Sequence, residues 1–142
     1  MIRAVIDTNI LIASLGKRSP YRWLYDGILN SSYTVLLTNS ILNEYHEVLQ
    51  FRTSNAVADN VCNLLCVLPT VEFITPYFAW NLVEADADDN KFVDCAVAAG
   101  AHALVTHDNH FTPLKALDFP PVPVMSIEEF YHLLQQAMTL EQ

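Results

Sequence analysis

The sequence predicts an α/β protein in which helices cover both faces of a mostly parallel sheet, a three-layer α/β/α arrangement. Short runs of β-branched and apolar residues alternate with longer stretches whose apolar residues recur at helical spacing, and this alternation continues along the whole chain. The 142 residues contain no repeat, low-complexity tract or interdomain linker. We therefore expect one domain spanning residues 1–142.

The first strand is expected where an apolar run leads up to Asp7. Pro69 ends the longest predicted internal helix, and Ser126 with Glu129 forms a capping box for the last helix. Turn-forming and capping residues separate the other elements. Strands are predicted at 3–6, 33–37, 71–75, 103–106 and 122–125, and helices at 10–15, 20–29, 41–50, 54–68, between 88 and 100, at 110–117 and after 126.

The composition is typical of a folded protein with a packed core, since 52% of the residues are hydrophobic. Apolar runs are too short to cross a bilayer. The N-terminus enters a strand-like run without the apolar core of a signal peptide, so we expect a cytoplasmic protein. Cys62, Cys66 and Cys95 are expected to be small buried hydrophobes, because they lack the spacing of a four-ligand zinc site.

The formal net charge of −9 argues against a broad basic face that clamps nucleic acid. It does not exclude an enzyme that meets phosphate through bound metal, since cations reverse the local charge of an acidic pocket. Three of the seven basic residues, Lys17, Arg18 and Arg22, follow the first predicted strand. They could meet RNA phosphates or belong to a solvated loop.

Residues 86–108 are predicted to form a helix, a turn and a strand with acids at both ends. Asp88 or Asp89 can cap the helix by accepting an unpaired backbone N–H, and Gly100 suits the left-handed position that ends a helix. Asp108 follows the strand. Because ligands in open α/β sheets bind outside the carboxyl ends of the strands, this stretch predicts an acidic site.

Four acids stand where this topology can bring them together: Asp7, Glu44, Asp94 and Asp108. Carboxylates suit hard cations such as Mg²⁺ and Mn²⁺, whereas clustered carboxylates without a cation repel one another. One or two ions, roughly 4 Å apart if two, can deprotonate water and stabilise displacement at phosphorus. Singly, each acid could be a turn former, a solvated helix acid, a helix-dipole partner or an N-cap. Their combination favours a metal site.

Asp89 has two interpretations. Capping and solvation explain it, yet it lies about a turn and a half before Asp94 and could support the metal ligands. His107 and His110 flank Asp108. One of them could bind a transition metal or donate a proton, although loop histidines are more often plain surface residues.

Four stretches follow one another along the chain: VIDTNILI at 5–12, NEYHEVL at 43–49, DDNKFVDCAVAAGA at 88–101 and LVTHDNHF at 104–111. In this order they resemble a PIN domain, and the resemblance covers nearly the whole chain. It is closest to the VapC-like toxins of bacterial and archaeal toxin–antitoxin systems, and it implies a metal-dependent ribonuclease of three-layer α/β/α fold. The family's acidic quartet corresponds here to Asp7, Glu44, Asp94 and Asp108.

The resemblance also implies supporting residues and partners. Asn9 matches the family's polar residue after the first aspartate, and Thr106 matches a polar position beside the fourth acid. A proteic antitoxin and frequent homodimerisation are further implications.

Two other function classes remain open. A non-catalytic PIN-like module that binds RNA or protein would suit the low basic content, although four acids gain nothing from mutual repulsion without a metal. A phosphatase needs Asp-x-Asp after the first strand, whereas Thr8 and Asn9 follow Asp7. A phospho-acceptor receiver domain needs a lysine after a late strand, where this chain has Ser126. A Mg²⁺- or Mn²⁺-dependent endoribonuclease is therefore the favoured interpretation.

Overall fold

The structure is a computed structural model that describes residues 1–141. At its centre is a five-stranded sheet in the order β3-β2-β1-β4-β5, in which every strand pair is parallel. The predicted α/β class and parallel sheet are therefore confirmed. The strands are β1 (Arg3–Ile6), β2 (Thr34–Leu37), β3 (Val71–Phe73), β4 (Ala103–Val105) and β5 (Val124–Met125).

Helices follow the strands as the capping residues predict. Thr38 and Ser54 cap their helices by accepting backbone N–H groups, and Gly100 ends its helix with a φ of 60°. The helices are α1 (Thr8–Ser14), α2 (Arg22–Leu29), α3 (Asn39–Arg52), α4 (Asn55–Val67), α5 (Asn90–Ala99) and α6 (Ile127–Glu141), with 3₁₀ segments η1 (Ala87–Asp89) and η2 (Asn109–Ala116).

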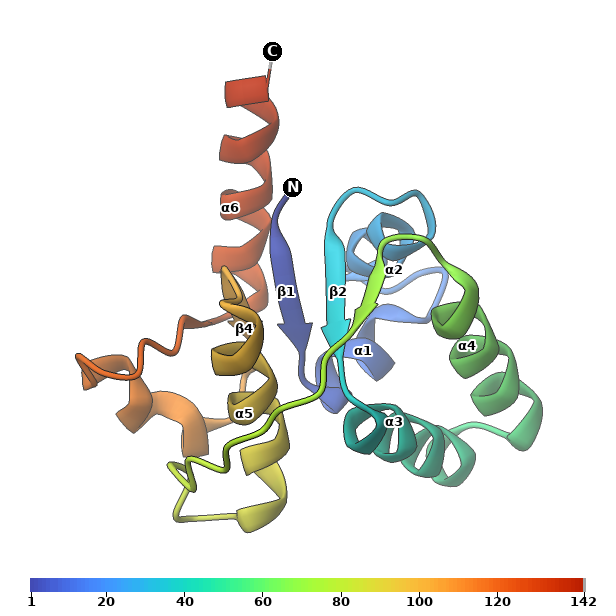
Figure 1. The fold of residues 1–142 in the computed structure, drawn as a ribbon. Coiled ribbons are helices and arrows are strands. Elements are labelled where there is room, and N and C mark those ends of the chain that lie inside the picture. Colours follow the sequence, from blue (N-terminus) through green and yellow to red (C-terminus); the bar gives the residue numbers. More distant parts are fainter. Residues whose placement is uncertain (142) are drawn as a thin grey trace.

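Helices lie on both faces of the sheet (Figure 1). α5 packs against β1, β2 and β4 on the face turned to the viewer. Behind the sheet, Phe130 of α6 stacks edge-on against Tyr33 and packs against Trp23 of α2. The central strands are therefore covered on both sides, as expected of a parallel sheet.

The core also fixes the end of β1 that matters for function. Residues 4–6 are at most 1% exposed. The buried Tyr45 of α3 donates a hydrogen bond to the carbonyl of Ile6, the last residue of β1. This bond ties α3 to the carboxyl end of the central strand, and it brings Glu44, the preceding residue, to the same edge of the sheet.

Several boundaries differ from those predicted. The third and fourth strands end at Phe73 and Val105, and the last strand begins at Val124. Residues 109–116 form a 3₁₀ segment, because Pro113 cannot donate to a regular α-helix. The first turn before α5 is capped by Asp86, which accepts the N–H of Asp88, so the predicted capping by Asp88 or Asp89 is wrong. Among residues 1–141, no helix combines the length and apolar character needed to cross a bilayer.

Candidate metal centre

Asp7 and Thr106 are neighbours at the carboxyl edge of the sheet. Ile6 of β1 pairs in register with Val105 of β4, so the residue after each strand emerges beside the other. The hydroxyl of Thr106 donates to Oδ2 of Asp7 at 2.7 Å. Both side chains are buried, and Asp7 is only 6% exposed.

Asp108 extends this arrangement into η2. Its backbone N–H donates to Oγ1 of Thr106 at 3.0 Å, so one hydroxyl serves both aspartates. The carboxylate of Asp108 accepts the N–H of His110 at 2.9 Å and caps η2. Asp108 therefore caps η2, as one reading of the sequence predicted. Its carboxylate is also close enough to Asp7 for its charge to raise the Asp7 pKa.

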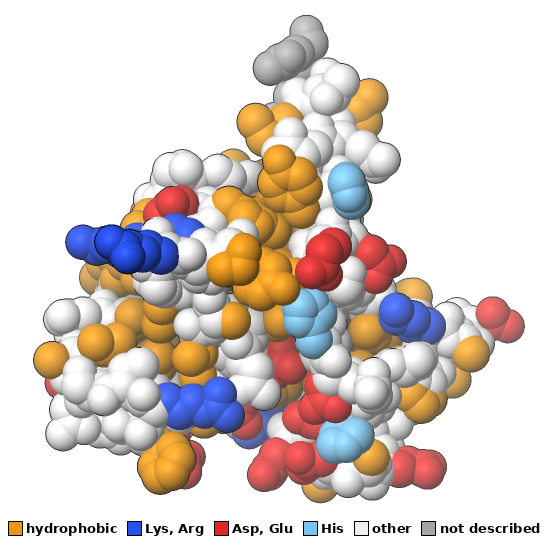
Figure 2. All heavy atoms as spheres, turned by 180° about the vertical axis from the view of Figure 1, so that it is seen from behind, with side chains coloured by type: hydrophobic (Ala, Val, Ile, Leu, Met, Phe, Trp, Pro, Cys, Tyr) orange, Lys and Arg blue, Asp and Glu red, His pale blue; other side chains and the backbone are white. Residues whose placement is uncertain are grey.

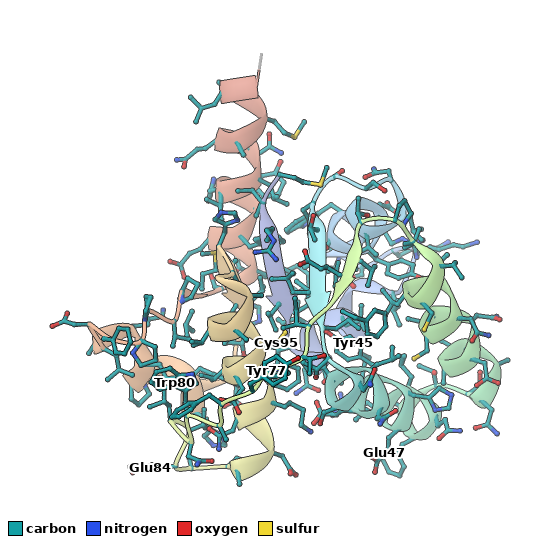
Figure 3. The ribbon with its side chains drawn as sticks, in the orientation of Figure 1. Tyr45, Glu47, Tyr77, Trp80, Glu84 and Cys95 are labelled. Carbon is teal, nitrogen blue, oxygen red and sulfur yellow. The ribbon has the colours of Figure 1, made fainter. Side chains whose placement is uncertain are left out.

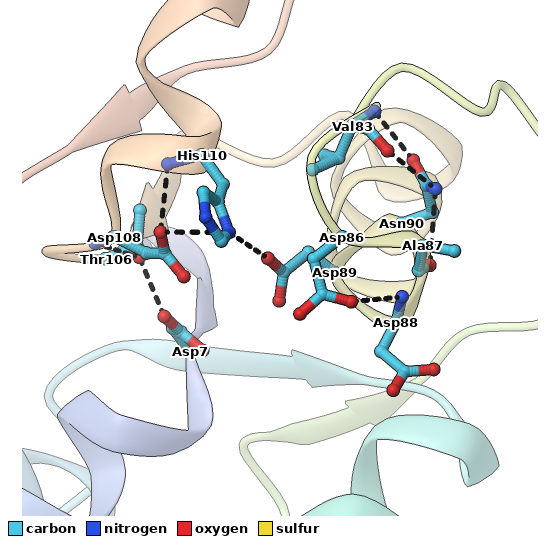
Figure 4. A network of polar contacts seen from close by, with 10 residues as sticks. All are labelled: Asp7, Val83, Asp86, Ala87, Asp88, Asp89, Asn90, Thr106, Asp108 and His110. Atoms are coloured by element: carbon cyan, nitrogen blue, oxygen red, sulfur yellow. Dashed lines mark hydrogen bonds and ion pairs between the residues drawn. The ribbon is translucent and has the colours of Figure 1, made fainter.

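Asp89, the last residue of η1, approaches the same edge just before α5. In Figure 4, His110 lies between Asp89 and Asp108, and its Nδ1 is 3.3 Å from a carboxylate oxygen of each. Ligand atoms of Asp86, Asp89 and His110 lie within 4.8 Å of one another. In the view from behind, acidic side chains gather around a histidine along the lower part of the surface (Figure 2).

Glu44 of α3 is held at both of its carboxylate oxygens. Thr8 of α1 donates to Oε2, and Nζ of Lys91 lies 2.8 Å from Oε1. Lys91 lies in the first turn of α5, two residues after Asp89. The side chains of both Glu44 and Lys91 are only about one fifth exposed, at 22% and 21%. Sequence reasoning missed Thr8 and Lys91, although Thr8 directly follows Asp7.

The structure does not bring Asp94 into this group. Its Oδ1 accepts the backbone N–H of Trp80 at 3.0 Å, and its side chain lines a cavity together with residues 74–79 and the start of α3. Asp94 is therefore engaged with the segment that follows β3, whereas Asp89 occupies the position near Asp7 and Asp108.

The other predicted residues are less involved. Asn9 is exposed, and within residues 1–141 its side chain has no hydrogen bond. His107 turns toward the start of α6, where its Nε2 lies 3.3 Å from Glu128. Arg22 pairs with Asp26 at 2.9 Å. Of the two histidines flanking Asp108, His110 is therefore the one beside the acids.

Burial disfavours the charged form of the carboxylates at this edge of the sheet. The pKa of Asp7 is raised from 3.8 to about 6; desolvation by burial is the largest cause, the charges of Asp89 and Asp108 add to it, and the Thr106 hydrogen bond opposes it. The pKa of Asp89 is also raised, mainly by burial, with Asp108 and Asp86 adding to it and His110 opposing it. A cation bound between these carboxylates would relieve their mutual repulsion and so stabilise the folded protein.

The donor set fits a hard divalent cation. Asp7, Asp89, Asp108 and Glu44 offer carboxylate oxygens, which Mg²⁺ and Mn²⁺ prefer. The imidazole of His110 adds a nitrogen ligand of the kind that transition metals bind. The fold and this cluster together define an α/β protein with an acidic site at the carboxyl edge of its parallel sheet.

Comparison with known proteins is consistent with this class. The family model described as PIN domain matches residues 3–110, and the chain belongs to the PIN domain family. No curated protein matches it in sequence.

Solved structures share the fold at low sequence identity. VapBC2 from Rickettsia felis, bound to a DNA fragment from its promoter, is 15% identical with a TM-score of 0.61, over 88% of this chain and 98% of that one. DNA-bound VapBC from Salmonella typhimurium is 15% identical with a TM-score of 0.59, covering 89% and 99%. VapC20 of Mycobacterium tuberculosis, a Sarcin-Ricin loop cleaving toxin, is 16% identical with a TM-score of 0.58, covering 78% and 93%.

Proposed function

We propose that the protein is a metal-dependent endoribonuclease that hydrolyses phosphodiester bonds. The observation that carries this proposal is the buried carboxylate of Asp7, held at the carboxyl edge of the sheet within the negative field of Asp89 and Asp108. Burying a carboxylate among other negative charges destabilises the fold. Carboxylates with such perturbed pKa values are concentrated at catalytic and metal sites. Membership of the PIN domain family supports the same conclusion.

Asp7, Glu44, Asp89 and Asp108 would hold Mg²⁺ or Mn²⁺, with Thr106 orienting Asp7 and Asp108. The bound cation would supply a water of lowered pKa and charge stabilisation at phosphorus. The protein's own part is to fix the carboxylates: Thr106 holds Asp7 and the Asp108 backbone, and Thr8 and Lys91 hold Glu44.

Asp89 replaces Asp94 in this proposal. The sequence-based quartet contained Asp94, with Asp89 in a supporting role. The charge of Asp89 reaches Asp7, and its carboxylate contacts His110 beside Asp108. The carboxylate of Asp94 accepts a hydrogen bond from the 76–83 segment, so we assign it a structural role.

RNA cleavage by a matched pair of variants tests this assignment. With Mn²⁺ and a single-stranded RNA, Asp89→Asn should lower the cleavage rate by more than about a hundredfold, since residues merely supporting ligands are worth roughly 10- to 100-fold. Asp94→Asn should cleave within a few-fold of wild type, because its amide oxygen can still accept from Trp80. The reverse order of rates would return the role to Asp94, and absence of any metal-dependent cleavage would remove the nuclease proposal.

We further propose that the chain is the toxin of a toxin–antitoxin pair, with a proteic antitoxin, a homodimeric state and a cytoplasmic location. The fold shared with VapBC complexes and with VapC20, a Sarcin-Ricin loop cleaving toxin, supports this. Induced expression should arrest growth of a bacterial host, while Asp7→Asn, made at equal level, should not. Equal growth of the two cultures contradicts a toxin that acts through this site.

A further inference from the structure

We propose that the segment 76–83 and the start of α3 form a groove that binds the unpaired bases of single-stranded RNA beside the metal centre. The inference rests on the proposed nuclease function and names side chains of this chain that would hold its substrate. The segment follows β3 and crosses the carboxyl edge of the sheet toward α5 (Figure 1).

The segment is held in place by two side chains one turn apart on α5. Asn90 accepts the N–H of Val83 at 2.8 Å and donates to its carbonyl at 3.2 Å. Asp94 accepts the N–H of Trp80 at 3.0 Å. Since these bonds fix the backbone, the aromatic side chains of the segment have a defined position.

Two of the three aromatic side chains of the segment face solvent, and Trp80 is partly buried. Tyr77 is 95% exposed and Phe78 is 63% exposed. Phe78 and Trp80 form an edge-to-face pair with centroids 4.7 Å apart, and Trp80 forms a second such pair with Phe119 at 5.7 Å. Figure 3 places Tyr77 between α5 and α3, with Trp80 beside α5. A fixed, open ring suits stacking by a base, whose π-face is available whatever its identity.

The groove shares lining residues with the cavity that contains Glu44, one of the proposed metal ligands. Tyr77 and Phe78 line a cavity together with Ser40 and Lys91. Ser40 and Lys91 also line the next cavity, which contains Glu44. A strand whose phosphate lies at the acids would therefore pass Lys91 on its way to the rings.

The chemistry of the groove favours a nucleic acid strand over an apolar helix. Asn39 and Ser40, with a carboxamide and a hydroxyl side chain, line the same cavity as the rings and Asp94, and Lys91 lines both cavities. Bases offer π-faces for the rings and polar edges for these groups. Because the chain has few basic residues, stacking supplies most of the binding.

Binding of labelled RNA to the cleavage-defective Asp7→Asn protein tests the proposal. We expect a single-stranded oligonucleotide to bind more tightly than a duplex of the same sequence. Adding Tyr77→Ala should weaken single-strand binding on the order of tenfold, Tyr77→Phe should restore it, and Phe51→Ala should change nothing. Phe51 is the matched control because it is an equally exposed aromatic, at 90%, at the far end of α3.

Equal affinities for Tyr77→Ala and its parent, or equal preference for duplex, overturn the proposal. The proposal is also overturned if sedimentation shows that Tyr77→Ala abolishes self-association or binding of a peptide partner while RNA binding is unchanged. RNA binding that depends on Tyr77 in a protein whose wild type never cleaves RNA refutes only the nuclease function. Metal-dependent cleavage with a KM indifferent to Tyr77 refutes only the groove.

Discussion

The hydroxyl of Thr106 donates to Asp7 at 2.7 Å and accepts the backbone N–H of Asp108 at 3.0 Å. One buried side chain thus fixes two carboxylates that follow adjacent parallel strands. The geometry arises from strand register, because Ile6 lies opposite Val105. The acidic edge is therefore built into the centre of the fold.

Replacing Thr106 by Val removes this link at nearly constant volume. The Asp7 carboxylate loses its donor and the Asp108 N–H its acceptor, so we expect unfolding to become easier by about 1–3 kcal/mol. The pKa of Asp7 should rise further, since the Thr106 hydrogen bond lowers it. Calorimetric Mn²⁺ titration at pH 6 should show weaker binding. Thr106→Ser keeps the hydroxyl and should behave like wild type; a Val variant with wild-type affinity would refute the linking role.

The metal-free protein should lose stability as pH rises through the range in which Asp7 ionises. Its pKa is raised in the folded protein from 3.8 to about 6, so its stabilising contribution is complete below pH 3.8 and is lost as pH passes about 6. The shift corresponds to about 3 kcal/mol. The measurement is urea unfolding in EDTA between about pH 4 and 7.5.

Asp7→Asn provides the control for that measurement, because it removes the titrating group while Asn can still accept from Thr106. The wild type should lose more stability than the variant over this range. Asp89, whose pKa is also raised, should leave a residual slope in both proteins. Parallel curves for the two proteins are the contrary result.

Lys91 is expected to act as the cation that accompanies Glu44 in the metal-free protein. In Lys91→Met the carboxylate loses its partner at 2.8 Å, so repulsion among the acids increases. We expect Tm without metal to fall by a few degrees, and saturating Mn²⁺ to raise it more than in wild type. Lys91→Arg keeps the charge and should resemble wild type in differential scanning calorimetry. A smaller Mn²⁺ shift in the Met variant would contradict this role.

Asn90→Ala should loosen the 76–83 segment. The buried Val83 N–H loses its acceptor, which costs about 1–3 kcal/mol. Amide hydrogen exchange should accelerate at residues 80–84 and stay unchanged in β1. Asn90→Asp retains the acceptor, so its exchange rates at residues 80–84 should lie between those of the wild type and Asn90→Ala. Unchanged exchange in the Ala variant would show that other contacts hold the segment.

The parallel fold and the meeting of Asp7 with Thr106 could be predicted because they follow from local pattern. Asp7 and Thr106 directly follow β1 and β4, so strand register brings them together, and Asp108 comes two residues later, with its N–H on Thr106. The different contacts of Asp89 and Asp94 could not be predicted from local pattern. Asp89 ends η1 and contacts His110, whereas Asp94 lies on α5 and accepts the N–H of Trp80, and both partners are distant in sequence.

The contacts of Glu44 depend on tertiary packing. Thr8 lies on α1, Glu44 on α3 and Lys91 on α5, and no local spacing relates these helices. The Tyr45 bond to Ile6 sets the position of α3, and it is a long-range contact between a helix and a strand. The sequence pattern could therefore propose Glu44 as a ligand without identifying the groups that hold it.

The most direct test of the metal centre is the position of Mn²⁺ in a crystal of the protein soaked with that ion. Anomalous scattering should show manganese bound by Asp7, Asp89 and Asp108, with Glu44 direct or through water. Asp94 should remain on the Trp80 N–H. Manganese bound by Asp94, or a soaked crystal with no manganese at Asp7, would contradict the account.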